Sequence, residues 1–214
     1  MNLSKPLNSL IPTLEAEVLA VLAGAEGSFT GRQVHAIVSG YSESGVRNAL
    51  KRLNTQGIVT RTPVGASDQY SLNLEHLMTK YIKSIANLRT EFLRIIREEV
   101  SNWEIPPLCA AIFGSATRSD MQPESDIDIF IARPNSIEFG LGIWREQCAS
   151  LSSNVSAWTG NDTQIFELNE KGIDQELTTT NGVIFSIIDQ GIIFYGPSDF
   201  LRSLLSKKVG KSAG

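Results

Sequence analysis

Residues 109–133 read CAAIFGSATRSDMQPESDIDIFIAR, and the interpretation of the whole chain starts from them. An apolar run over residues 108–113 has the length of a buried strand and is short for a helix. A Gly-Ser pair interrupts it, and a second apolar run over residues 127–132 begins beside two acids, Asp126 and Asp128. The pattern predicts two strands joined by a turn that carries polar side chains.

The two acids are spaced to hold a cation. Residues i and i+2 of a strand point to the same face, about 6–7 Å apart along it. Ionised carboxylates of Asp126 and Asp128 would repel each other there, and each is costly to desolvate without a cation. One Mg²⁺, or two about 3.5–4 Å apart, would remove this penalty. The spacing therefore predicts a magnesium site.

The Gly114-Ser115 pair is a candidate phosphate-binding turn. A helix predicted to start over residues 116–120 would direct free backbone N–H groups and its positive dipole end toward a phosphate. Glycine lets a ligand approach the backbone, and the Ser115 hydroxyl is a further donor. A phosphate site on one strand end that faces metal-binding carboxylates on the next strand suits phosphoryl or nucleotidyl transfer.

This arrangement resembles the signature of the nucleotidyltransferase superfamily, and is most similar to its minimal branch. A Gly-Ser pair, about ten residues and then Asp-x-Asp inside an apolar strand make up the resemblance. It implies catalytic, metal-binding roles for Asp126 and Asp128, and nucleotide binding by Gly114, Ser115 and Arg118, the last displaced by one place from the usual motif. It also implies one or two Mg²⁺ ions and an NTP, with ATP expected.

In similar proteins a third carboxylate comes from a later strand, which is expected here over residues 163–168. Gln164 falls on the usual acid position, and Glu167, three residues later, points to the other face. Two alternatives follow. Either Glu167 is the third catalytic acid through a shifted register, or the chain binds a nucleotide without efficient transfer.

The N-terminal part predicts three short helices and a hairpin. Apolar residues recur at helical spacing after Thr13, Thr30 and Ser42, and two strands are expected over residues 58–62 and 69–72. This order resembles a winged helix-turn-helix.

The resulting fold class is α+β, with three parts. We expect a winged helix-turn-helix over residues 13–74, a connecting helix over residues 75–105, and a nucleotidyltransferase-like α/β domain with a small mixed sheet over residues 106–205. One continuous helix is expected over residues 74–102. Its broad apolar stripe predicts packing against both modules or against a second copy in a homodimer.

The third N-terminal helix presents a polar face that suits a DNA major groove. Arginine and asparagine can read base edges there, and lysine can contact phosphates. Residues 1–73 carry six Lys/Arg against five acids, however, which is a weak basic footprint. A solvated face and a protein-binding face therefore stay open as alternatives. The candidate DNA-binding residues are Ser44, Arg47, Asn48, Lys51, Arg52 and, in the hairpin, Arg61.

Composition places the chain among globular cytoplasmic proteins. Its 214 residues are 42% apolar and 20% charged, and no apolar run approaches the roughly 20 residues of a membrane span. Two cysteines, Cys109 and Cys148, form no disulfide framework and no metal-binding spacing. Residues 108–214 carry eight Lys/Arg against thirteen acids, as expected for a half that binds cations.

Three functions are compatible with these observations. The first is transfer of a nucleotidyl group from Mg²⁺-NTP to a hydroxyl acceptor, coupled to DNA binding by the winged helix. The second is a DNA-binding transcriptional regulator that responds to nucleotide without transferase activity. The third, implied only by the resemblance to minimal nucleotidyltransferases, is an antitoxin-like partner of a small helical toxin, in which a protein would be the acceptor.

Overall fold

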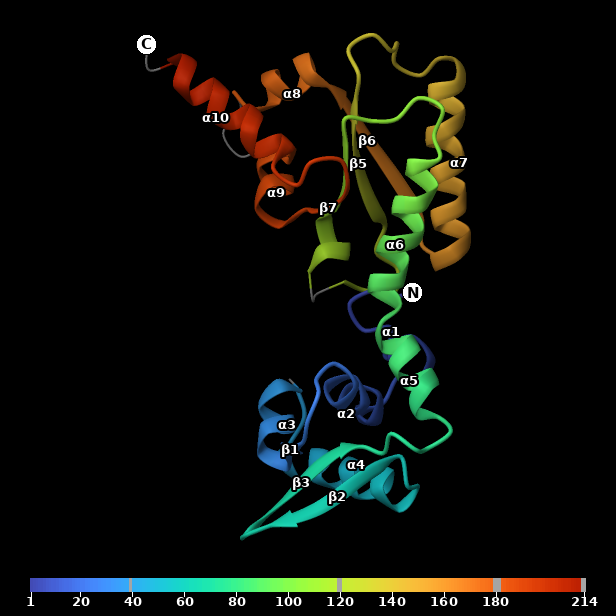
Figure 1. Cartoon of the computed structure of the whole chain (residues 1–214), viewed down its shortest axis with the longest axis vertical. Coiled ribbons are helices and arrows are strands. Elements are labelled where there is room, and N and C mark those ends of the chain that lie inside the picture. Colours follow the sequence, from blue (N-terminus) through green and yellow to red (C-terminus); the bar gives the residue numbers. More distant parts are fainter. Residues whose placement is uncertain (39, 119–120, 179–181, 213–214) are drawn as a thin grey trace. The chain divides into compact units, whose positions relative to one another are not determined.

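Figure 1 shows the computed structural model of the chain, which describes residues 1–38, 40–118, 121–178 and 182–212. Contacts divide the chain into two compact units. The N-terminal unit is Asn2–Thr90, and the C-terminal unit is Glu91–Gly214 together with Met1. The division falls within helix α6 (Leu88–Ser101), upstream of residues 103–107, where the sequence places a helix stop.

The N-terminal unit combines helices with a three-stranded antiparallel sheet. The strand order is β1-β3-β2, so β2 lies at an edge. The elements are α1 (Pro6–Leu10), α2 (Leu14–Ala23), β1 (Phe29–Thr30), α3 (Gly31–Ile37), α4 (Glu43–Thr55), β2 (Val59–Val64), β3 (Ser67–Leu72) and α5 (Thr79–Ala86).

Side-chain caps and one apolar face account for helices α3 and α4. Thr30 and Gln33 form a reciprocal capping box at the start of α3, and the Ser42 hydroxyl accepts a hydrogen bond from the Gly45 N–H at the start of α4. Helix α4 buries one face in the core of the unit, through Val46, Ala49, Leu50 and Leu53. These residues recur at i, i+3, i+4 and i+7, so the opposite face of α4 is left to solvent.

The hairpin is longer than predicted. Strand β2 runs to Val64 and β3 starts at Ser67, so only Gly65 and Ala66 form the turn. Pro63 is tolerated inside β2 because an edge strand can lack one N–H on its outer side. Helix α1 and strand β1 were not predicted.

The single helix expected over residues 74–102 is wrong. The structure has α5 and α6, separated by Asn87, whose φ of −91° and ψ of 6° end α5. Asparagine is a weak helix former because its side chain competes for backbone hydrogen bonds. Apolar periodicity continues across this break, which is why the pattern concealed it.

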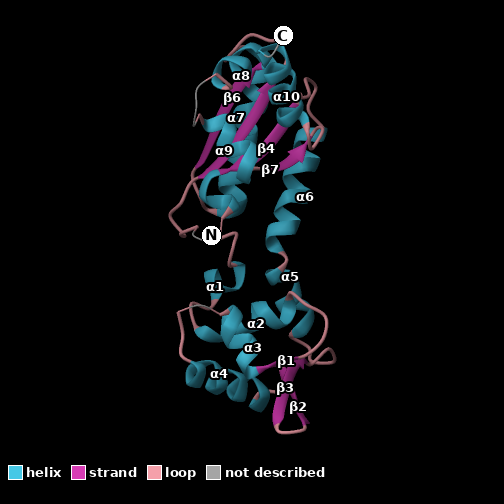
Figure 2. Ribbon diagram, turned by 90° about the vertical axis from the view of Figure 1, so that its left-hand side faces the viewer, coloured by secondary structure: helices cyan, strands magenta, loops and turns pink. Residues whose placement is uncertain are grey.

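The C-terminal unit confirms the predicted small mixed sheet. The strand order is β6-β5-β4-β7, with β5 parallel to β6 and the other pairs antiparallel, and Figure 2 shows this sheet among the helices of its unit. After α6 the elements are β4 (Cys109–Phe113), the 3₁₀ helix η1 (Gly114–Thr117), β5 (Ile127–Arg133), α7 (Gly142–Thr159), β6 (Thr163–Asn169), α8 (Glu170–Glu176), α9 (Val183–Gln190), β7 (Ile192–Tyr195) and α10 (Phe200–Ser212).

Strand β5 is the centre of this unit and is buried on both faces. Ile127, Ile129 and Ile131 point to one face, while Phe130 and Ala132 point to the other, where they join the core formed with α8, α9 and α10. Asp128 has the same parity as Phe130 and therefore lies at the end of that second face.

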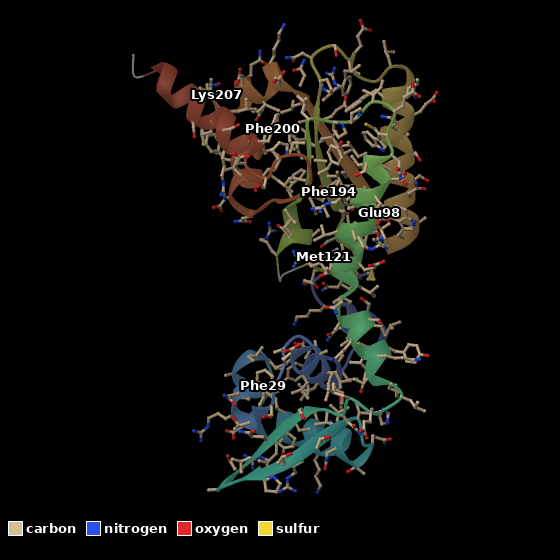
Figure 3. The ribbon with its side chains drawn as sticks, in the orientation of Figure 1. Phe29, Glu98, Met121, Phe194, Phe200 and Lys207 are labelled. Atoms are coloured by element: carbon tan, nitrogen blue, oxygen red, sulfur yellow. The ribbon has the colours of Figure 1, made fainter. Side chains whose placement is uncertain are left out.

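Edge strand β7 is held by a charged side chain. The Arg97 guanidinium on α6 donates a hydrogen bond from Nε to the Phe194 carbonyl oxygen at 2.7 Å. Phe194 itself is buried and is labelled in Figure 3. No helix in the described part of the chain is long and apolar enough to cross a membrane.

Candidate functional site

The Asp128 carboxylate packs directly against the backbone of Gly114. Asp128 pairs with Phe113, the last residue of β4, so the chain turns at Gly114 beside the carboxylate. Gly114 has a φ of +70°, and a Cβ placed on it would lie 2.3 Å from Asp128 Oδ2. Position 114 therefore requires glycine for two reasons, its backbone conformation and the space that Asp128 occupies.

The electrostatics of the two carboxylates favour a cation. Burial raises the pKa of Asp128 above its ordinary value, and the neighbouring charge of Asp126 raises it further. No ion pair joins either carboxylate to a lysine or arginine of the described residues. Asp126 is exposed and Asp128 half-buried, so an ion from solvent has access to them.

The predicted helix after the Gly-Ser pair is wrong over its described part. Residues 114–117 form only the 3₁₀ turn η1, and Arg118 follows in an extended conformation with φ −105° and ψ 165°. Residues 119 and 120 of the expected helix lie outside the described residues. Without a helix there is no helix dipole at this point. Gly114, Ser115 and Arg118 are still brought to one tight turn beside Asp128, with Arg118 exposed.

Strand register separates the two candidates for a third carboxylate. In the parallel pairing of β5 with β6, Asp128 lies opposite Gln164. Glu167 lies opposite Ile131 and therefore on the other face of the sheet. The structure thus brings Gln164, and not Glu167, next to the carboxylate pair.

Glu167 belongs to a buried polar cluster under α7. Its Oε2 accepts a hydrogen bond from the Trp144 indole at 2.7 Å, and its Oε1 lies 3.5 Å from Arg133 Nε. The side chains of Glu167 and Arg133 are each 10% exposed. Burial, followed by the Glu167 charge, raises the pKa of the neighbouring Cys148 thiol to about 12. The prediction of Glu167 as a catalytic carboxylate beside Asp126 and Asp128 is contradicted by this placement.

The donor set at the pair suits a single hard cation. The described residues contain no group of three or more His, Cys, Asp or Glu side chains that would hold a metal ion. Two carboxylates and the neighbouring Gln164 amide provide oxygen ligands, which Mg²⁺ prefers, and this ion commonly keeps several waters. Asp126 and Asp128 therefore fit one Mg²⁺ better than a pre-formed two-metal site.

Two residues next to the pair were not predicted. The buried side chain of Asn161 contacts the loop that leads to Asp126, and the Asp162 carbonyl accepts a hydrogen bond from the Ile127 N–H at 2.8 Å. The only sequence signal was the Gly-Asn-Asp run at residues 160–162, which predicts a turn without indicating what the turn contacts.

The candidate DNA-binding face is exposed, but each of its three arginines forms an ion pair with an acid of the same unit. All six of its predicted residues are exposed. Arg47 pairs with Glu43 at 3.0 Å, Arg61 pairs with Asp68 at 2.8 Å, and Arg52 pairs with Glu15. Beside α4 and the hairpin lies an open cleft of about 580 Å³, lined in part by the first of these pairs. A nucleic acid would have to compete with these acids for the arginines.

Comparison with protein families gives a match to the C-terminal half of the chain. Residues 95–196 match the family model described as "Polymerase beta, Nucleotidyltransferase". The matched segment spans β4, the Gly114 turn, β5 and β6, and so includes every element of the carboxylate site. A search of curated proteins found no match.

Two solved structures illustrate the structural likeness. One is a toxin–antitoxin crystallised with AMP-PNP, with 13% identity and a TM-score of 0.38 over 56% of this chain and 86% of that chain. Another is the toxin–antitoxin MntA-HepT, with 12% identity and a TM-score of 0.35 over 58% of this chain and 86% of that chain. The family match shows that residues 95–196 are similar in sequence to a nucleotidyltransferase domain.

Gly114→Ala tests the contact with Asp128, and Gly140→Ala is its matched control. Both glycines have a φ of +70°, but a Cβ at Gly140 meets nothing within 4 Å. The backbone strain, roughly 1–2 kcal/mol, is common to both variants. We expect the larger drop in thermal unfolding temperature for Gly114→Ala, because only there must Asp128 move. Equal drops would contradict the contact.

Asp128→Asn tests the electrostatics of the pair in metal-free buffer with a chelator. Because the pKa of Asp128 is raised in the folded chain, the folded chain keeps the Asp128 proton over a pH range in which the unfolded chain has released it. Folding stability therefore falls as pH rises through this range. We expect calorimetry to give Asp128→Asn a higher unfolding temperature than wild type at pH 7, with the difference shrinking on acidification. Asp162→Asn, at an exposed position, serves as the control, and a pH-independent difference would contradict the prediction.

Proposed function

We propose that the C-terminal unit binds Mg²⁺-NTP and transfers its nucleotidyl group to a hydroxyl acceptor. The observation that carries this proposal is the Asp128 carboxylate, packed on Gly114 beside Asp126, with no lysine or arginine in the described part of the chain paired to either acid. The family match over residues 95–196 supports the same class of chemistry.

Each residue of the site has a distinct part in the proposal. Asp126 and Asp128 would hold the Mg²⁺, which when bound offsets negative charge on the phosphates during in-line displacement. The Ser115 hydroxyl and the backbone at Gly114 would bind the terminal phosphates, because no Cβ keeps them away. Arg118, exposed at the end of the turn, would add positive charge toward the triphosphate.

Calorimetric titration of Mg²⁺-ATP and Mg²⁺-GTP tests this site directly. We expect wild type to bind at least one of them. We expect Asp126→Asn/Asp128→Asn to weaken binding at least about tenfold, because even changes to residues that only contact a metal ligand typically cost that much. Glu167→Gln is the matched control, because it neutralises an acid on the other face of the sheet and should retain binding. Absence of binding by wild type would contradict the proposal.

A second candidate function is a nucleotide-responsive DNA-binding regulator without turnover. The position of Gln164 opposite Asp128 favours it, because an amide cannot accept the proton of an attacking hydroxyl as a carboxylate can. Pyrophosphate release from Mg²⁺-NTP in the presence of an acceptor would support transfer. Duplex affinity that changes with nucleotide, without pyrophosphate release, would support the regulator.

For either function we propose that the N-terminal unit is a winged helix that binds DNA through α4 and the β2–β3 hairpin. The order of α2, α3 and α4 followed by the β2–β3 hairpin, with β1 completing a three-stranded antiparallel sheet, supports this assignment. The exposed side chains of Arg47, Asn48 and Lys51 on one face of α4 support a groove-facing role. A homodimer and a protein acceptor or toxin partner stay predictions from the sequence.

The DNA prediction is tested on a mixed-sequence duplex with Arg47→Ala/Lys51→Ala. We expect weaker binding, with the slope of log affinity against log salt reduced by about one for each phosphate that the variant no longer neutralises. Arg94→Ala/Lys83→Ala removes the same two residue types from exposed positions outside this face and should leave the slope unchanged. An unaltered slope in the first variant would count against the α4 face.

A further inference from the structure

Asn161 is the most deeply buried polar side chain near the carboxylate pair. It lies in the turn between α7 and β6 and is only 4% exposed. The turn is made by Gly160, whose φ of +72° ends α7 in the left-handed conformation and directs the next residue toward the sheet.

The side chain of Asn161 bridges two segments that are distant in sequence. Its amide nitrogen donates hydrogen bonds to the carbonyl oxygens of Pro123 and Ser125, both at 2.9 Å. Its side-chain oxygen accepts a hydrogen bond from the amino group of Met1 at 2.7 Å. Both the nitrogen and the oxygen of the Asn161 side-chain amide are thus hydrogen-bonded, as is expected of a buried amide.

The bridged segment leads directly into the metal-binding pair. Residues 122–125 form a closed turn, in which the Ser125 N–H donates to the Gln122 carbonyl at 3.1 Å and the Gln122 N–H donates to the Ser125 hydroxyl at 3.0 Å. Met121, labelled in Figure 3, is buried at the start of this segment. Asp126 follows at once, and the next N–H, that of Ile127, donates to the Asp162 carbonyl. Asp126 is therefore fixed on both sides by one turn, residues 161–162.

Thr159 links this bridge to helix α7. Its hydroxyl donates to the Val155 carbonyl at 2.7 Å and accepts the Asn161 N–H at 3.2 Å. A continuous path of hydrogen bonds thus runs from the last turn of α7 through Asn161 to the backbone that carries Asp126.

We infer that Asn161 is a positioning residue for the Asp126–Asp128 pair. The inference rests on the proposed nucleotide site, and Asn161 acts through the backbone of residues 123–125 without touching the ligand. Loss of its two donors leaves two carbonyls unpaired and lets Asp126 move away from the position that Asp128 and the cation require. The proposed binding site therefore depends on a turn whose side chains are not themselves ligands of the cation or the nucleotide.

The test compares Asn161→Asp with Asn169→Asp in the full-length chain. Both variants replace an asparagine near one end of β6 by the isosteric acid. The Asn169 side chain accepts a hydrogen bond from the Gly172 N–H at 2.9 Å, and an aspartate at position 169 can still accept it. Mn²⁺ is titrated with ATP present and followed by its electron paramagnetic resonance signal. We expect Asn161→Asp to weaken Mn²⁺ binding about 10- to 100-fold, as for other outer-shell changes, and Asn169→Asp to leave it unchanged.

Amide hydrogen exchange gives a second readout that needs no metal. We expect faster exchange in Asn161→Asp at the amides of Gln122, Ser125 and Ile127, with the amides of β4 and the rest of β5 unaffected. Faster exchange spread evenly over the sheet would indicate general destabilisation and would overturn the inference. So would unchanged Mn²⁺ binding.

Thr159→Val and Thr159→Ser decide the question if Asn161→Asp does not fold. Valine removes only the hydroxyl that orients Asn161, while serine keeps it. We expect Thr159→Val to weaken Mn²⁺ binding and Thr159→Ser to restore it; equal binding by both would overturn the inference. If wild type binds no Mn²⁺-ATP, the proposed function fails, and hydrogen exchange still shows whether Asn161 holds the loop.

Discussion

The parallel pairing of β5 with β6 is the constraint on which the composition of the site depends. A parallel register places paired side chains on the same face, so the partner of Asp128 is also its neighbour in space. That partner is Gln164, an amide without charge. The same register sends Glu167 to the opposite face, where Trp144 and Arg133 surround it. One pairing thus gives the sheet one face that carries two neighbouring acids, and on the other face a separate buried polar cluster.

Several features of the C-terminal unit were predictable because they depend on local pattern alone. The apolar runs located β4 and β5, and the i, i+2 spacing placed Asp126 and Asp128 on one face. Parity also showed that Gln164 and Glu167 could not both face the pair. Which of them does depends on how two strands align, and a single chain does not encode that alignment in its periodicity. The spacing of the carboxylate pair was therefore foreseeable, whereas the choice between Gln164 and Glu167 as the neighbour of Asp128 was decided only by strand register.

The remaining differences have a common origin in contacts between residues far apart in sequence. Composition gave the N-terminal module a small positive charge, but only the structure shows that Arg47, Arg52 and Arg61 are each paired with an acid. The Gly-Asn-Asp turn looked like a connection, and its amide proves to bind a loop 36 to 38 residues earlier in the chain. The turn η1, which takes the place of the expected helix over the described residues, lies against Asp128 of β5 at Gly114.

The Arg97 side chain on the Phe194 carbonyl has a consequence for how this protein behaves at high concentration. Strand β7 is an edge of the four-stranded sheet, and an unpaired edge is a template on which another chain can add a strand. The Arg97 guanidinium is bound to one carbonyl of this strand and brings a charge to it, and charged side chains are one of the devices that disfavour pairing at a sheet edge. We expect this arginine from helix α6 to disfavour the addition of a further strand at β7.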